Sequence, residues 1–227
     1  MDNTVENLSR AGIGYIKRGS IYAIIVAILD IPLYILEFLF ISRFTGIINS
    51  VTSNGLHMPA GEYYIFYTLM LISLAGLIIL TFGIANYREG FRNFKGLDTR
   101  FSKPFSYSKY VIMLYIIFII VYVFILAFLP ASNQNIHFPA LSSSSTLAHV
   151  FLVLLLISAL IVLIISVLAL VGFIYILIGL YRFSGMVHQE VGELGAILYI
   201  IPIANIVSPF LIYVASSRAE KLRVPDE

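Results

Sequence analysis

Two carboxylates inside an apolar stretch of membrane-spanning length are the residues best placed to do chemistry. Asp30 and Glu37 lie in "AILDIPLYILEFLFISR", which runs from Ala27 to Arg43. Seven residues make two helical turns, so both side chains would share one helix face. A bare carboxylate in lipid costs several kcal/mol, so each acid must be paired, hydrated or protonated.

The sequence offers these two acids hydroxyls and amides as partners. The other apolar segments contain no Lys or Arg. The expected partners are Tyr, Ser and Thr hydroxyls, the amide of Asn205, or a basic group on a neighbouring chain. Pro32 adds a further hypothesis, in which Asp30 caps a half-helix that begins at Ile31 and makes the segment discontinuous. Broken helices with buried acids are a feature of ion-coupled transporters; a structural polar contact is the alternative.

Enzyme chemistry finds little support in the sequence. The chain has no cysteine, which excludes disulfides, zinc–thiolate sites and cysteine nucleophiles. Metalloprotease, phosphate-loop, dinucleotide and kinase signatures are missing. His57 and His137 fall in predicted loops, His149 at a helix end and His188 in a further loop. A metal site built from the first three is the alternative to plain solvated histidines, and we predict no enzyme activity, no cofactor and no metal.

Composition indicates the class of protein. The chain has 227 residues, of which 60% are hydrophobic and 11% are charged, against about 45–50% and about 25% in soluble domains. A water-soluble protein of this composition could not cover its surface, so lipid must surround much of the chain. The formal net charge of only +2 argues against nucleic-acid binding. The predicted fold class is all-α, a polytopic transmembrane helical bundle in a single integral membrane domain over residues 1–227.

Five segments have the length of about 20 residues that a helix needs to cross the hydrocarbon core. The fifth contains Pro202, Asn205 and Pro209. We favour a kinked crossing for it, and the alternative is a re-entrant hairpin. The predicted spans are 21–42, 63–86, 110–130, 149–181 and 194–215.

Basic residues predict how the chain is threaded. The connector 87–109 is rich in Lys and Arg, and the N-terminal stretch holds Arg10, Lys17 and Arg18. The positive-inside rule places both in the cytoplasm. The N-terminal stretch is expected to be a short amphipathic helix on the headgroups or a poorly ordered tail. The connector either binds anionic lipid headgroups or merely fixes the topology. The candidate headgroup contacts are Arg88, Arg92, Lys95, Arg100 and Lys103.

Two pairs of glycines predict close helix packing. Gly76 and Gly83 are seven residues apart, as are Gly172 and Gly179. Each pair therefore lies on one helix face and lets another backbone approach.

Three stretches carry a resemblance to a known family. They are "AGIGYIKRGSIYAII", "GFRNFKGLDTRFSKPFSYSKY" and "IGLYRFSGMVHQEVGELGAILYIIPIANIVSPFLIYV". Together they resemble a domain-of-unknown-function family of crenarchaeal multi-pass membrane proteins. The resemblance implies an archaeal plasma-membrane location, and it supplies no activity and no site residue.

Two functions follow as predictions. The first is a non-catalytic accessory or scaffold subunit of a membrane assembly, partnered by the lipid bilayer and by other membrane subunits or further copies of itself. The alternative is a proton- or ion-coupled transporter or channel subunit that uses Asp30 and Glu37. Both place the chain in the cell membrane with a cytoplasmic N-terminus.

Overall fold

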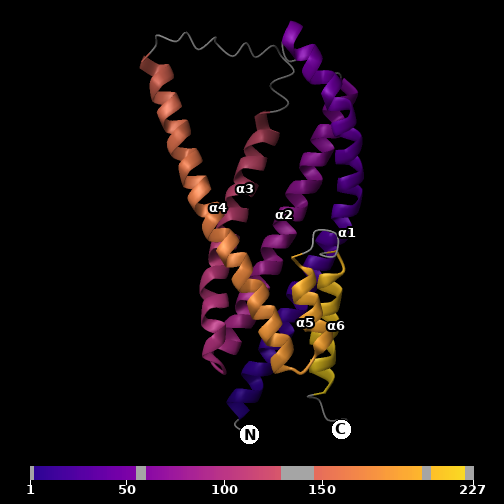
Figure 1. Cartoon of the computed structure of the whole chain (residues 1–227), viewed down its shortest axis with the longest axis vertical. Coiled ribbons are helices and arrows are strands. Elements are labelled where there is room, and N and C mark those ends of the chain that lie inside the picture. Colours follow the sequence, from indigo (N-terminus) through magenta and orange to yellow (C-terminus); the bar gives the residue numbers. More distant parts are fainter. Residues whose placement is uncertain (1–2, 55–59, 129–145, 201–205, 223–227) are drawn as a thin grey trace.

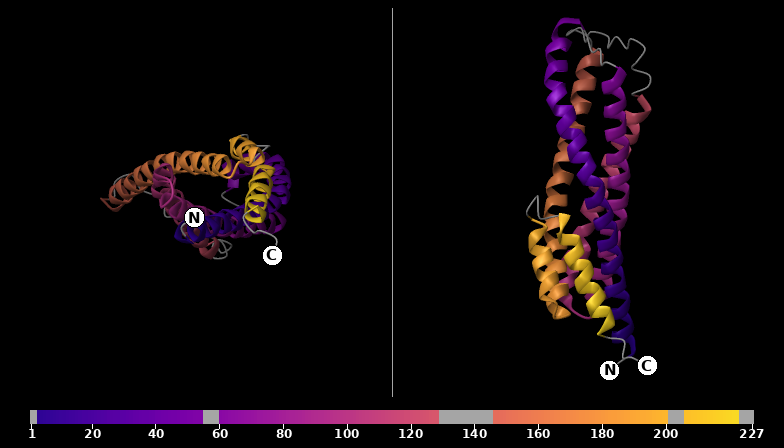
Figure 2. Two further views of the ribbon diagram at one scale, coloured as in Figure 1. Left: turned by 90° about the horizontal axis from the view of Figure 1, so that it is seen from below. Right: turned by 90° about the vertical axis from the view of Figure 1, so that its right-hand side faces the viewer.

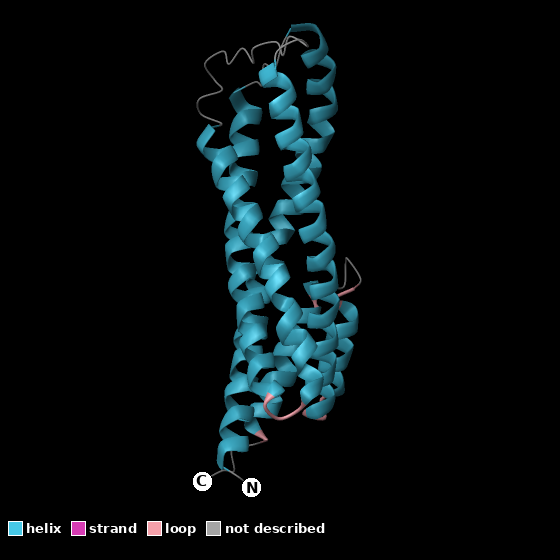
Figure 3. Ribbon diagram, turned by 90° about the vertical axis from the view of Figure 1, so that its left-hand side faces the viewer, coloured by secondary structure: helices cyan, strands magenta, loops and turns pink. Residues whose placement is uncertain are grey.

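The described part of the chain is built from helices. The computed structural model describes residues 3–54, 60–128, 146–200 and 206–222, with side chains over 6–35, 64–65, 67–127, 160–200 and 206–222. No strand lies within these ranges (Figure 3), so the all-α fold class is confirmed. The elements are α1 (Asn3–Asn54), α2 (Ala60–Lys95), the 3₁₀ helix η1 (Thr99–Phe101), α3 (Ser102–Phe128), α4 (Thr146–Met186), α5 (Glu190–Leu198) and α6 (Ser208–Lys221).

The four long helices run side by side along the molecule, alternating in direction (Figure 1). Each contains a stretch long and apolar enough to cross a membrane. A helix satisfies its own backbone polar groups, which a segment in lipid must do because it has no water partners. The chain therefore fits an integral membrane protein. The four stretches are Glu6–Ile35, Tyr67–Lys95, Thr99–Ala127 and Leu160–Met186.

The first helix is continuous through Pro32. α1 extends from Asn3 to Asn54 with Pro32 inside it. The expectation of a half-helix starting at Ile31 is therefore wrong. Proline removes one backbone hydrogen bond, and the remaining bonds of a long membrane helix tolerate that loss.

A helical hairpin replaces the kinked crossing expected over 194–215. A Cβ added at Gly195 would lie 3.1 Å from Ile212 Cγ1 and 2.9 Å from Leu211 Cβ. The Ser208 hydroxyl donates to the Gly195 carbonyl at 2.5 Å. These contacts pair α5 with an antiparallel α6, and both helices flank only the half of the bundle nearest the chain termini (Figure 2). The structure thus has the hairpin geometry of the alternative and not a fifth crossing helix.

The hydrophobic core lies at the end of the bundle that carries both termini. Four phenylalanines with 0% exposure form its centre, and the Phe94 ring centroid lies 5.4 Å from those of Phe101 and Phe183. Ile13 and Ile16 of α1 are buried in the same cluster. The N-terminal stretch is therefore neither a surface helix nor a loose tail, because it continues α1 into the core.

Most of the basic connector is helical. α2 extends to Lys95, and α3 begins at Ser102. Between them, the Arg100 side chain and backbone N–H donate to the Asp98 carboxylate at 2.7 and 2.8 Å. These hydrogen bonds hold the pKa of Asp98 below its usual value. The predicted loop over 87–109 is thus reduced to a short capped turn.

Candidate functional site

A seam of glycines joins α1 to α2. A Cβ added at Gly19 would lie 3.0 Å from the Gly83 carbonyl oxygen, and one added at Gly90 would lie 3.3 Å from the Gly12 carbonyl oxygen. The two backbones are therefore nearly in contact, as small residues allow in membrane helices. Sequence reasoning singled out Gly83 and missed the other three, although Gly12 and Gly19 share its seven-residue spacing.

A cavity begins next to the glycine seam. Val26 follows Gly19 by seven residues on α1, and Gly76 precedes Gly83 by seven residues on α2. Val26 and Gly76 line this cavity of about 430 Å³, and a Cβ added at Gly76 would meet nothing within 4 Å. We call this space, which lies farther from the termini, the distal cavity. Its other lining residues include Asp30, Leu33, Ser73, Phe118 and Tyr122.

A second cavity lies on the side of Asp30 that is nearer the termini. This proximal cavity has a volume of about 230 Å³ and reaches from α1 to the hairpin. Val26, Asp30 and Leu80 line both cavities. Asp30 is the ionisable group among these three, so a carboxylate lines both cavities. Further lining residues of the proximal cavity are Gly83, Tyr87, Tyr115, Phe173, Tyr199 and Pro209.

A chain of hydroxyl groups begins at the lining of the proximal cavity. Tyr199, directly after α5, is a hydrogen-bond partner of Tyr87 on α2. The Tyr87 hydroxyl lies 3.2 Å from the Ser20 hydroxyl, which donates to the Ile16 carbonyl at 3.0 Å. The Ser20 hydroxyl donates its hydrogen to the Ile16 carbonyl, so it accepts from Tyr87. The Tyr87 hydroxyl in turn accepts from Tyr199. The hydroxyls therefore form one directed chain from the hairpin to α1.

Asp30 lies in the stretch of α1 that is long and apolar enough to cross a membrane. It follows Arg18 by twelve residues along α1, which is about 18 Å of helix. Half of a hydrocarbon core is about 15 Å. If Arg18 marks the headgroup level, the carboxylate is at mid-membrane depth, where an ionisable group indicates a functional site.

The other predicted glycine pair packs against α3. A Cβ added at Gly172 would lie 2.6 Å from the Tyr107 carbonyl oxygen and 2.9 Å from Val111 Cγ2. One added at Gly179 would lie 2.9 Å from Pro104 Cβ. Helix α4 therefore approaches the α3 backbone without space for a methyl group.

Comparison with known proteins places the chain in a family. Residues 9–225 match the family model described as "Protein of unknown function (DUF973)". The chain belongs to this family. The search of curated proteins and that of solved structures return no match. The resemblance to a domain-of-unknown-function family is thus confirmed, while the crenarchaeal origin and the multi-pass character remain predictions.

Several residues predicted for this DUF973 member lie outside the described side chains. Glu37 lies in α1, where its side chain is not described, and Asn205 is outside the described residues. The same holds for the side chains of His57, His137 and His149. His188 is exposed and sits at φ 54° after the end of α4. Among the side chains that are described, no three His, Asp or Glu residues group to hold a metal ion.

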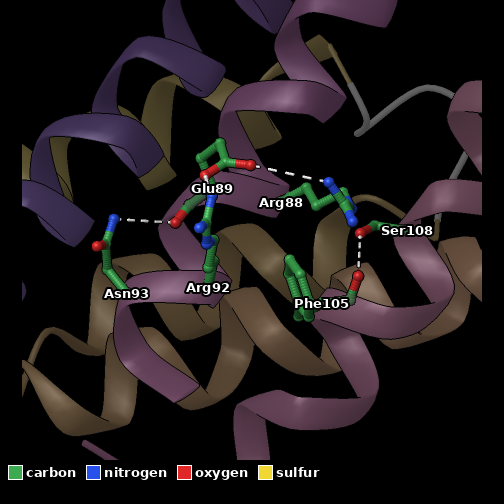
Figure 4. A network of polar contacts seen from close by, with 6 residues as sticks. All are labelled: Arg88, Glu89, Arg92, Asn93, Phe105 and Ser108. Carbon is green, nitrogen blue, oxygen red and sulfur yellow. Dashed lines mark hydrogen bonds and ion pairs between the residues drawn. The ribbon is translucent and has the colours of Figure 1, made fainter. Parts of the chain in front are cut away.

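The five candidate headgroup contacts of this DUF973 protein divide into two sets. Arg92 pairs with Glu89 at 3.3 Å, and Arg100 pairs with Asp98 at 2.7 Å, so both are engaged locally. Arg88 and Lys95 lie against the Phe105 ring of α3. Lys103 Nζ lies 6.0 Å from the centroid of the Tyr175 ring. Figure 4 shows Arg88 and Arg92 turned toward Glu89, with Phe105 beside them.

The hairpin is fastened to α1 by an ion pair. Lys17 Nζ lies 2.6 Å from Glu220 Oε2 and 5.8 Å from the centroid of the Tyr213 ring. The side chains of Lys17 and Glu220 are 28% and 44% exposed, so water screens part of their attraction. The pair holds α6 at the end of α1 that enters the core, close to the hydroxyl chain.

Proposed function

We propose that this protein is a non-enzymatic integral membrane protein that binds and passes protons at Asp30. One observation carries the proposal: a carboxylate in the candidate membrane span of α1 lines two cavities at once. An ionisable group in a membrane helix is costly, and acids kept there in known proteins serve proton relays and ion pathways. The transporter or channel hypothesis is therefore placed ahead of the accessory role.

The lining of the cavities favours a proton over a metal ion. Four tyrosines, Tyr87, Tyr115, Tyr122 and Tyr199, line the two cavities together with apolar side chains. Ca²⁺ takes six or more oxygen ligands and Mg²⁺ demands six in near-ideal geometry, whereas a proton needs one acceptor and a path of hydrogen bonds. The hydroxyls of Tyr199, Tyr87 and Ser20 add hydrogen-bonding groups on the side of the termini.

A vesicle assay tests the proposal. The purified full chain is reconstituted into liposomes that enclose a pH-sensitive dye, and the external pH is lowered. Acidification of the lumen is expected to be about tenfold faster than in protein-free vesicles, because the carboxylate replaces a bare hydrocarbon barrier. Valinomycin and potassium are included so that charge build-up does not limit the rate. A rate equal to that of protein-free vesicles would contradict the proposal.

We further propose a membrane location and an accessory role for this protein. We place the protein in the plasma membrane with a cytoplasmic N-terminus, on the strength of the basic residues around 88–109 and at the N-terminus. A role beside other membrane subunits is compatible with a proton path, since small channel subunits commonly assemble. Purification in a gentle detergent followed by identification of the chains that co-purify tests that role, and recovery of a monomer alone would count against it.

A further inference from the structure

The structure assigns a second site to this chain, a pair of cations over one aromatic ring that binds the phosphodiester of an anionic lipid headgroup. It is independent of the proton path. Its residues are Arg88 and Lys95 of α2 and Phe105 of α3, which we call the headgroup site.

Two cations of α2 share one aromatic ring of α3. The Arg88 guanidinium carbon lies 4.5 Å from the Phe105 ring centroid, and Lys95 Nζ lies 5.5 Å from it. Seven residues separate the two cations, so they lie on one face of α2. The ring restrains both positive groups, which lowers the entropy lost when they bind an anion.

The protein leaves these two cations incompletely neutralised. The closest ion pair of Arg88 is with Glu89 at 3.7 Å, longer than a charge-assisted hydrogen bond of about 2.8 Å, and Glu89 is shared with Arg92. Among the described side chains, Arg88 Nε is one of two buried polar atoms without a hydrogen-bond partner. Lys95 makes no ion pair with a described acid. The headgroup site therefore has positive charge in excess of the described acids beside it.

The position of the headgroup site identifies the source of the anion. Arg88 and Lys95 lie toward the end of the candidate span Tyr67–Lys95, where basic side chains reach the lipid headgroups. Segment 88–109 has six basic and two acidic residues, and basic segments next to a membrane attract anionic lipids. The guanidinium donates to phosphate oxygens in the plane of its fork, while the ammonium of Lys95 supplies the second charge.

Native mass spectrometry of the full chain tests the site. Delipidated protein is offered equal amounts of phosphatidylglycerol and phosphatidylcholine, and bound lipid is counted. We expect the wild type to prefer phosphatidylglycerol about tenfold and Arg88→Gln/Lys95→Gln to lose most of that preference. The matched control is Arg10→Gln/Lys221→Gln, which removes two charges from exposed positions elsewhere and should bind as the wild type does.

Two further arms separate the alternatives. Phe105→Leu should weaken binding although both charges remain, whereas Phe105→Tyr should restore it, because the ring positions the cations. Unfolding temperatures of all variants show whether each remains folded. Equal binding by the wild type and Arg88→Gln/Lys95→Gln would overturn the site, as would an equal loss in the control pair. Displacement of the lipid by millimolar glycerol phosphate would overturn the lipid as the source of the anion.

Discussion

Asp30→Asn is expected to lower proton flux in vesicles to the level of protein-free liposomes, a loss of about tenfold or more. Asparagine has nearly the shape of aspartate, so both cavities keep their lining. Its amide cannot accept and release a proton at neutral pH, so the step between the two cavities is removed. Asp30→Glu should keep part of the flux, because the carboxylate survives with one more methylene group.

The same substitution separates a functional acid from a structural one. Removing a charge from mid-membrane depth relieves a desolvation penalty, so Asp30→Asn should unfold at the same temperature as the wild type or above it. Glu190→Gln is the matched control, since it neutralises an exposed acid at the start of α5, and its flux should be unchanged. Undiminished flux in Asp30→Asn would remove Asp30 from the path.

Gly172→Ala is expected to cost about 1–3 kcal/mol of unfolding free energy, the range of overpacked cores. The new methyl group would lie 2.6 Å from the Tyr107 carbonyl oxygen. That atom belongs to the backbone of α3, so relief requires α3 and α4 to separate. The loss should be visible as a lower midpoint in detergent unfolding followed by circular dichroism.

Gly76→Ala provides the matched control for this prediction. Both glycines lie in long apolar helices, but the methyl group at position 76 would meet nothing within 4 Å. Alanine is the better helix former by about 1 kcal/mol, so Gly76→Ala should be neutral or stabilising. Equal destabilisation of the two variants would show that the α3–α4 contact is not as close as described.

The long helices could be predicted because lipid leaves the backbone few choices. Four of the predicted spans fall in α1 to α4, since an apolar run of membrane length must satisfy its own backbone hydrogen bonds. The place of Asp30 inside the apolar part of α1 followed from the sequence. What surrounds it did not, because the cavities depend on where α2 and α3 approach α1, and these approaches depend on side chains far apart in the sequence.

The errors arose where tertiary contacts outweigh local signals. Pro32 suggested a break, yet α1 is continuous, because one missing hydrogen bond is a small loss in a helix of this length. The segment after residue 194 is apolar enough to cross, but Gly195 and Ser208 let two short helices pack together instead. The N-terminal stretch looked weakly amphipathic, and its Ile13 and Ile16 are buried by phenylalanines of α2 and α4.

Labelling with a hydrophobic carbodiimide tests the central claim most directly. Dicyclohexylcarbodiimide reacts with protonated carboxyl groups in apolar surroundings, and peptide mass spectrometry locates the adduct. A carboxyl group that takes up and releases protons at mid-membrane depth should give an adduct on Asp30 that forms faster as the pH falls, while a water-soluble carbodiimide should favour exposed Glu190. Absence of an Asp30 adduct at every pH, in a protein that still labels elsewhere, would contradict the account.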